Sequence, residues 1–347
     1  MIKAFWLQKK HLLWSWGGLI LLIISIWMQV QMDVALNMWN GRFYDLLQNA
    51  LSYQNSPNAG FDIFFNQIVS LKYTLSGFKA KYPPSFLEIA MPYISLAIFT
   101  NWFTRIYGFR WREALTFYYV EGWRNVEHEI EGASQRIQED CYRWARIIES
   151  LGLQFVRTIM TLIAFIPLLW TFSAKISIEL LKPIAGSLVW VSLISSIGGL
   201  IVSWFVGWRL PGLEYNNQKV EAAFRKDLVL GEDDKKNYAQ PDTLLSLFTG
   251  IKLNYYRLFL HYGYFDFWAT GYSLFMNIVP LILMGPSVFS GAITLGVLFQ
   301  VANAFDRVQS GFSIFLQNWV TITELRSIWK RLHEFEENIN LYNVGSV

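Results

Sequence analysis

The chain alternates between long apolar runs and long polar segments. Residues 12–32, 158–174, 183–208 and 267–305 contain no acidic or basic side chain. A membrane-spanning helix needs about 20 consecutive, mostly apolar residues. The last run is long enough for two such helices, and its middle, GPSVFSG, has the glycine, proline and serine residues typical of a turn. The pattern therefore predicts an all-α integral membrane protein.

The positions of these runs predict six spans. They are expected near residues 12–31, 87–107, 153–172, 184–207, 266–286 and 292–320. The second is the weakest, because Glu88 and Arg105 limit its uncharged part to 16 residues; the alternative for this segment is a buried core helix. Segments 109–150 and 209–262 are too rich in charge to cross a bilayer. They contain few glycines and prolines, so we expect them to extend the spans as helices outside the membrane.

The basic residues predict the orientation. With the N-terminus inside, the inner segments hold 21 of the 29 lysines and arginines and the outer segments hold six. Such an excess marks the cytoplasmic side. We therefore expect both termini in the cytoplasm, one transmembrane domain over residues 1–337, and a short cytoplasmic tail over residues 338–347. The first apolar run is too long for a signal peptide and lacks a following cleavage site, so we interpret it as a retained span.

Composition excludes several functional classes. Charged residues make up 16% of the chain, against about 25% in soluble domains, and the net charge of +3 follows from the orientation bias rather than from a nucleic-acid partner. Cys141 is the single cysteine, and the four histidines lack metal-ligand spacing. The sequence has no phosphate-binding loop, nucleophile elbow or dinucleotide fingerprint. We expect no enzyme activity in this chain and no cofactor.

Acidic residues form a stripe after the fourth predicted span. Glu214, Glu221 and Glu232 are separated by 7 and 11 residues, steps that return to within about 20° of one helix face. A row of carboxylates facing a cavity suits cationic cargo or proton uptake and release. The alternative is a solvated face balanced by nearby lysines and arginines, with Arg225 placed four residues after Glu221 to form a helix pair.

Two further sets of charges lie near predicted spans. Glu139 and Glu149 are 10 residues apart in a segment that leads into the third span. Asp306 and Arg307 lie in the middle of the last span, where charges usually face a bundle interior or a wet cavity. Adjacent helix residues point about 100° apart, so this pair is not expected to neutralise itself. Either the pair belongs to a transport path, or it makes contacts between helices, with Arg307 or Arg157 meeting a glutamate.

Two long segments carry a resemblance to a known family. GLEYNNQKVEAAFRKDLVLGEDD and IEGASQRIQEDCYRWARIIESLG closely resemble signature segments of the SbmA/BacA family of bacterial peptide-antibiotic importers. Further matches include NMWNGRFYDLLQNAL, FRWREALTFYYVEGW and KLNYYRLFLHYGYF, and the similarity extends from about residue 27 to 337.

The resemblance implies a fold and a function. The fold is a six-span transmembrane domain like that of ABC exporters, with no nucleotide-binding domain attached. The function is proton-driven import of peptides, including antimicrobial peptides, by a homodimer in the bacterial inner membrane. Carried over by motif, the proton-coupling glutamates of the dimer cavity are Glu139, Glu149, Glu221 and Glu232. Glu214 is an addition from spacing alone.

The chain also departs from the family pattern. It is expected to lack an extra N-terminal membrane helix, its segment 53–86 is longer and more polar, and Asp227 stands in place of a glutamate. Two other functions stay open: a membrane subunit powered by a separate ATPase, and a docking protein that binds peptides without transport. The energy source distinguishes the first from proton-driven import, and accumulation of peptide inside the cell distinguishes the second.

Overall fold

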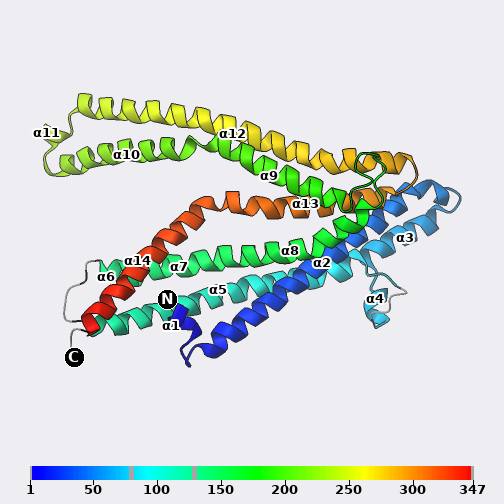
Figure 1. The fold of residues 1–347 in the computed structure, drawn as a ribbon, viewed down its shortest axis with the longest axis horizontal. Helices are drawn as coiled ribbons and strands as arrows, with labels where there is room; N and C mark the ends of the chain where they lie inside the picture. Colours follow the sequence, from blue (N-terminus) through cyan, green and yellow to red (C-terminus); the bar gives the residue numbers. More distant parts are fainter. Residues whose placement is uncertain (1, 78–81, 127–129, 131, 345–347) are drawn as a thin grey trace. The chain divides into compact units, whose positions relative to one another are not determined.

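The computed structural model describes residues 2–77, 82–126, 130 and 132–344, and these residues form helices and no strand. The long helices are α2 (Gly18–Gln48), α5 (Phe86–Arg124), α8 (Leu153–Ser173), α9 (Ser187–Gly207), α10 (Leu210–Asp233), α12 (Pro241–Phe289), α13 (Leu295–Gln317) and α14 (Trp319–Val344). Figure 1 shows them together with the short helices α1 (Ile2–Trp6), α3 (Pro57–Val69), α4 (Lys72–Leu75), α6 (Ala133–Gln135), α7 (Cys141–Ile147) and α11 (Lys235–Tyr238).

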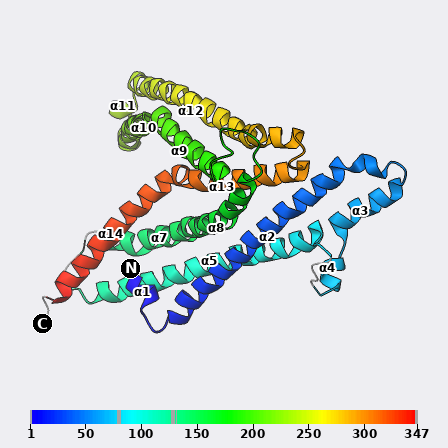
Figure 2. The same ribbon diagram turned by 45° about the vertical axis from the view of Figure 1, so that its right-hand side comes forward.

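Helix α2 is the centre of the first of two compact units, which comprises residues 1–192 and 280–347. It packs against α5, α8 and α13, while α14 packs against α7. Figure 2 shows α2 crossing α5, and α14 running past α7. The helices that hold the charged pair at residues 306–307 and the glutamates at 139 and 149 therefore belong to one unit.

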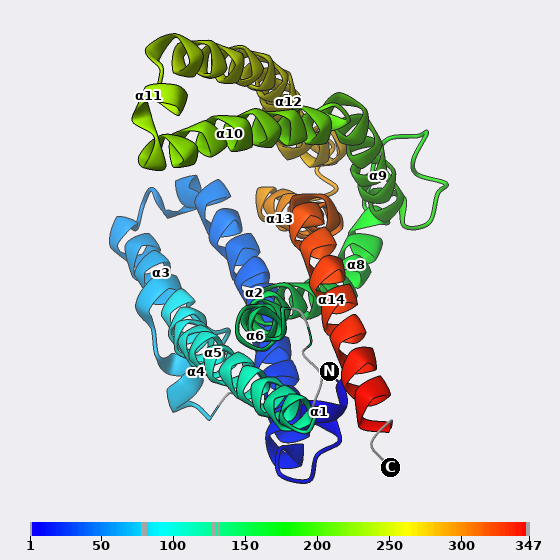
Figure 3. The same cartoon turned by 90° about the vertical axis from the view of Figure 1, so that its left-hand side faces the viewer.

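The second unit, residues 193–279, is a helical hairpin. Helix α10 leads through α11 into α12, as Figure 3 shows. The rings of Phe224 on α10 and Phe248 on α12 lie 6.0 Å apart between centroids. The Trp268 indole donates a hydrogen bond of 2.9 Å to the Ser203 hydroxyl of α9. The predicted helical character of residues 209–262 is thus present in α10, α11 and the first part of α12.

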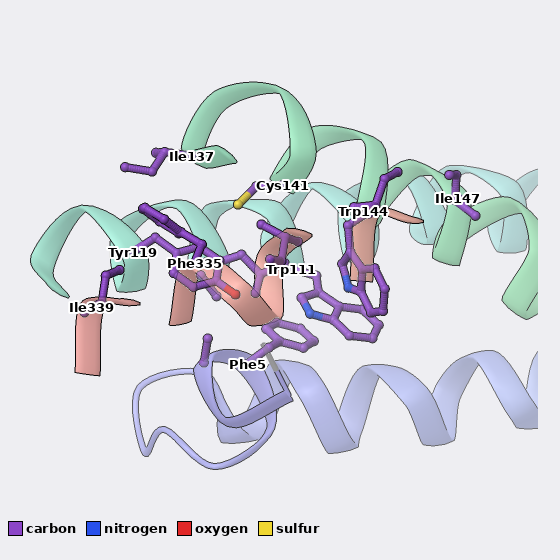
Figure 4. Packing of buried hydrophobic residues seen from close by; sticks show 14 of the residues in the cluster. Phe5, Trp111, Tyr119, Ile137, Cys141, Trp144, Ile147, Phe335 and Ile339 are labelled. Atoms are coloured by element: carbon purple, nitrogen blue, oxygen red, sulfur yellow. The ribbon is translucent and has the colours of Figure 1, made fainter. Parts of the chain in front are cut away.

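An aromatic core joins α1, α5, α7 and α14 (Figure 4). Phe5 and Tyr119 are fully buried there, and the Phe5 ring stacks on Trp111 with centroids 5.4 Å apart. The Tyr119 hydroxyl donates to a Glu336 carboxylate oxygen at 3.0 Å. Burying an aromatic side chain stabilises a fold by about 1.5–3 kcal/mol, so this cluster fixes both the segment before the first span and α14.

Five helical stretches in the described residues are long and apolar enough to cross a membrane. They are Leu13–Gln48, Phe86–Arg124, Ala133–Ser173, Ser187–Asp233 and Pro241–Phe289, which overlap the first five predicted spans; the first and fourth begin one and three residues later than predicted. Only 11% of the apolar window in the second stretch is buried, so this helix does not fit the alternative of a buried core helix.

The sixth predicted span, residues 292–320, corresponds to α13 and is not among these stretches. Polar side chains at Gln300, Asn303, Asp306, Arg307 and Gln309 interrupt its apolar pattern. The sixth span therefore stays a prediction.

Three boundaries differ from those predicted. The turn signal NSPNAG begins helix α3, because Pro57 occupies its first turn, where a missing N–H costs nothing. Helix α12 runs through the predicted turn at 286–291 as far as Phe289. Helix α14 continues to Val344, so the predicted tail is helical up to that residue. Residues 78–81 of the long 53–86 segment and residues 345–347 of the tail lie outside the described residues.

A close approach of α2 and α13 depends on Gly296. A Cβ atom there would lie 2.0 Å from the Gly41 carbonyl oxygen and 2.4 Å from Asp45 Oδ1. Because no side chain intervenes, α2 can cap the start of α13: Gly296 N–H donates to Asp45 Oδ1 at 2.9 Å, and Leu295 N–H donates to Gln48 Oε1 at 2.7 Å. These bonds satisfy N–H groups that a helix start leaves without intrahelical partners.

We expect Gly296→Ala to destabilise the protein, because the new methyl group meets backbone and forces α13 away from its cap. Overpacking of this kind costs about 1–3 kcal/mol. The thermal unfolding midpoint of the detergent-solubilised protein, followed by tryptophan fluorescence, should fall by several degrees. Gly271→Ala on α12 is the control, because a Cβ there meets nothing within 4 Å. Equal midpoints for the two variants would contradict the packing described.

Candidate transport path

The glutamates at 139 and 149 both lie on π-helical turns. Residues 133–173 form a nearly continuous helix that widens at Arg136–Asp140 and again at Ile148–Gly152. Turns of this kind are rare and occur often at functional sites. These turns are not predictable from the sequence, because neither segment contains a residue pattern that distinguishes a π-helical turn from an α-helical one.

Glu149 lies against α5. A Cβ atom on Gly108 would come within 2.9 Å of Glu149 Oε2, so the glycine makes room for the carboxylate. Glu149 lines a cleft of about 500 Å³ together with Asn101, Arg105, Ser150 and Gln154. Polar side chains from α5, the second π-helical turn and α8 therefore share one space in the first unit.

Arg157, also on this cleft, is held by polar partners inside the helices. Its guanidinium donates to the side-chain oxygen of Gln29. Gln29 is fully buried, and its amide donates to the Thr100 hydroxyl at 2.7 Å. Buried polar groups need such partners to offset the loss of water. One alternative from the sequence pairs Arg307 or Arg157 with a glutamate; the hydrogen-bond partner of Arg157 is instead a glutamine, because α2 presents Gln29 at that level.

Arg307 forms an ion pair with Asp33 of α2, with 3.2 Å between the two side chains. The Asp33 side chain is 7% exposed and that of Arg307 is 49% exposed. Asp306 and Arg307 both line a second cleft of about 310 Å³ with Asp33, Asn37 and other residues. Arg307 thus makes a contact between helices, as one alternative predicts, but its partner is an aspartate and not a glutamate. Asp306 and Arg307 also both face a cleft.

Glu139 belongs to a charge network that ties the first π-helical turn to α14. Its carboxylate lies 2.7 Å from the Arg143 guanidinium, which also lies 3.2 Å from Glu324 of α14. The neighbouring Asp140 is buried and receives two hydrogen bonds from Arg331, at 2.6 and 3.0 Å. These bonds raise the pKa of the Arg331 guanidinium above its usual value. Arg136, four residues earlier, also pairs with Asp140 at 3.1 Å. Asp140 was not predicted from the sequence, because its partner on α14 lies 191 positions away.

The predicted acidic stripe lies on a single helix of the second unit, α10. Glu214 and Glu221 line one cleft of about 510 Å³ with Asn217, Arg225 and other residues. Within the described part of the chain, no ion pair joins Glu221 to Arg225. Glu232 is exposed in the last turn of the helix and does not line that cleft. The structure therefore brings two of the three stripe residues together.

Comparison with known proteins agrees with this architecture. The chain has several apolar helices long enough to cross a membrane. Charged and amide side chains form contacts between these helices. Both features are typical of a polytopic membrane transporter. The chain belongs to the SbmA/BacA-like family, whose model matches residues 8–340.

Several curated proteins are similar to the chain. The Inner membrane ABC transporter ATP-binding protein YddA of Escherichia coli strain K12 is 28% identical over 97% of this chain and 59% of its own length. ABC transporter D family member 2, chloroplastic, of Arabidopsis thaliana is 27% identical over 68% of the chain and 32% of its own length. An uncharacterized ABC transporter ATP-binding protein of Synechocystis, sll0182, is 24% identical over 70% of the chain and 36% of its own length. The chain thus spans about a third to three-fifths of these relatives.

The Asp33–Arg307 pair gives an asymmetric prediction. Arg307→Gln removes the ion-pair partner of a buried carboxylate and leaves Arg157 as the nearby positive charge, so the cost should be at most about 3–5 kcal/mol, the cost of a broken buried pair. Asp33→Asn leaves a half-exposed guanidinium that reaches water, so the loss should be nearer the 0–1 kcal/mol of surface pairs. We expect a larger fall in the thermal unfolding midpoint for Arg307→Gln. Lys330→Gln, at an exposed pair of 3.8 Å, is the control. A larger fall for Asp33→Asn than for Arg307→Gln would contradict the burial described.

Proposed function

We propose that two copies of this chain form a homodimer in the bacterial inner membrane and import peptides, antimicrobial peptides among them, driven by the proton gradient. The observation that carries the proposal is the placement of carboxylates on clefts: Glu149 on one in the first unit, and Glu214 and Glu221 on one in the second. Carboxylates in such positions can exchange protons with water. In the cleft on α10, where Glu214 and Glu221 outnumber Arg225, they also give a negative lining that favours cationic peptides.

In the proposed cycle, protons from outside bind these carboxylates. Neutralised carboxylates no longer repel one another, so the helices that carry them can move and open the cavity inward. Loss of the protons to the cytoplasm then resets the transporter.

The Glu139 network offers a link from protonation to helix movement. Arg143 contacts both Glu139 and Glu324, so it bridges the first π-helical turn and α14. Protonation of Glu139 would remove one of the two charges that hold Arg143, and would change the balance of contacts at α14. In this proposal Glu232, which is exposed at the end of α10, takes up or releases protons at the cytoplasmic end of the path.

A second candidate function is favoured by the names of the relatives. Three similar proteins are called ABC transporters, two of these names include ATP-binding, and the chain spans only part of each. In this alternative the chain is the membrane part of an ATP-driven transporter. The hairpin of α10, α11 and α12 would then be the contact with an ATPase.

Uptake by reconstituted protein separates the two functions. Purified protein in liposomes, with an alkaline interior and no ATP, should accumulate a fluorescently labelled cationic proline-rich peptide. We expect Glu221→Gln to abolish gradient-dependent uptake, because the variant cannot exchange the proton. Glu334→Gln is the matched control, since Glu334 is an exposed residue that pairs only loosely with Lys330, and uptake by this variant should equal that of the unaltered protein.

Other outcomes of this experiment contradict the proposal. Uptake that needs ATP and an added ATPase, and not the proton gradient, supports the second candidate function. Peptide binding without accumulation in the liposomes contradicts both and makes the protein a docking site. Equal losses in Glu221→Gln and Glu334→Gln would exclude a special role for the cleft on α10.

A further inference from the structure

One face of α5 combines exposed apolar side chains with arginines. Successive steps of 4, 4, 3, 4 and 3 residues keep the positions on this face within about 40° of a common line along the helix. The face consists of Ile94 (50% exposed), Ile98 (65%), Trp102 (57%), Arg105, Phe109 (62%) and Arg112. The first half of this face is apolar, and basic residues enter only in the second half.

The basic half of this face borders a third cleft of the first unit, of which only Arg105 and Glu149 also belong to the proposed transport path. This cleft has a volume of about 380 Å³ and lies between α5 and α7. Arg105, Arg112 and Arg146 line it with Tyr142, Phe109 and Glu149. Three guanidinium groups face one carboxylate, so the cleft has a net positive charge. Within the described part of the chain, none of the three arginines forms an ion pair.

Tyr142 holds two of these arginines in place. The Arg112 guanidinium lies over the tyrosine ring, 4.8 Å from the centroid. Arg146 donates a hydrogen bond of 3.1 Å to the tyrosine hydroxyl. The guanidinium groups therefore have a defined arrangement, while N–H donors that these contacts leave unused are available to an anion.

The length of the apolar half matches one leaflet of a bilayer. From Ile94 to Arg105 the helix rises by about 17 Å, at 1.5 Å per residue. Half of the hydrocarbon thickness of a typical bilayer is about 15 Å. Trp102 lies one turn before the first arginine, at the level where tryptophans concentrate in membrane proteins. The face thus has acyl-chain contacts and headgroup contacts at the spacing of a phospholipid.

We propose that this cleft binds the phosphate headgroup of an anionic phospholipid, whose acyl chain lies along Ile94, Ile98 and Trp102. Arginine forks suit phosphate oxygens, and basic pockets between membrane helices are known to bind anionic headgroups. A second copy of the chain on this face would bury three guanidinium groups against the single carboxylate of Glu149, unless it supplied carboxylates of its own. A free anion would satisfy the arginines and leave the apolar face uncovered. Arg105 and Glu149 also line the cleft of the proposed transport path, whereas Arg112, Arg146 and Tyr142 line the headgroup cleft and not that one.

Native mass spectrometry of the detergent-purified protein tests the proposal. The protein is titrated with phosphatidylglycerol and with phosphatidylcholine of the same acyl chains. We expect tighter binding of phosphatidylglycerol, and a loss of about fivefold in its affinity for each of Arg105→Gln, Arg112→Gln and Arg146→Gln, the factor typical of one basic residue beside anionic lipid. Binding of phosphatidylcholine should stay unchanged, which also shows that each variant is folded.

Arg110→Gln is the matched control. It removes the same charge from the same helix, but Arg110 is paired with Glu113 at 3.0 Å and lies off the lipid face. This variant should bind phosphatidylglycerol as the unaltered protein does, and Arg105→Lys should retain more affinity than Arg105→Gln.

Three results would overturn the proposal. Equal affinity for the two lipids excludes recognition of the headgroup charge. Complete displacement of phosphatidylglycerol by millimolar inorganic phosphate assigns the cleft to free phosphate. Loss of the bound lipid whenever the protein dimerises assigns the face to an interface between copies of the chain.

Discussion

The constraint on which the structure depends is that polar side chains within apolar helices need a partner or water. Arg157 donates a hydrogen bond to Gln29, and Gln29 donates one to Thr100, so α8, α2 and α5 are joined at one level. Arg307 forms an ion pair with Asp33, and this pair joins α13 to α2. Each of these groups also borders a cleft, or contacts a residue that does. The polar contacts that hold the helices together therefore also border the two clefts of the first unit.

Close packing of the helices makes these contacts possible. The glycine at 296 brings the start of α13 against α2, and Gly108 gives the Glu149 carboxylate a place beside α5. At the other end of the first unit, Asp140 and Arg331 join α14 to the helix that carries both π-helical turns. Both π-helical turns thus lie beside contacts that set the position of neighbouring helices, and the proposed proton coupling depends on this arrangement.

Much of this architecture follows from local patterns in the sequence. Apolar runs predict the helices that can span a membrane, the 7- and 11-residue spacing places the three stripe glutamates on α10, and the long motifs predict the family, which the family match confirms. The roles of Glu139, Glu149, Glu221 and Glu232 in proton coupling stay predictions. Contacts between distant residues were not predictable: Asp33 and Arg307 are 274 positions apart. The π-helical turns depend on hydrogen bonding along the backbone, which residue types alone do not specify.

Thiol accessibility tests the central claim, a water-filled path beside lipid-facing helix surfaces. Cys141 is fully buried, so the unaltered chain gives an unreactive background. Single cysteines would be placed at Asn101 and Gln154, which line the cleft around Glu149, and at Ile98 and Ile163, which are exposed on apolar surfaces. In membranes open on both sides, a charged, membrane-impermeant thiol reagent should label the first two positions and leave the second two unlabelled. Failure to label Asn101→Cys and Gln154→Cys would contradict the account, because the cleft would then be closed to water.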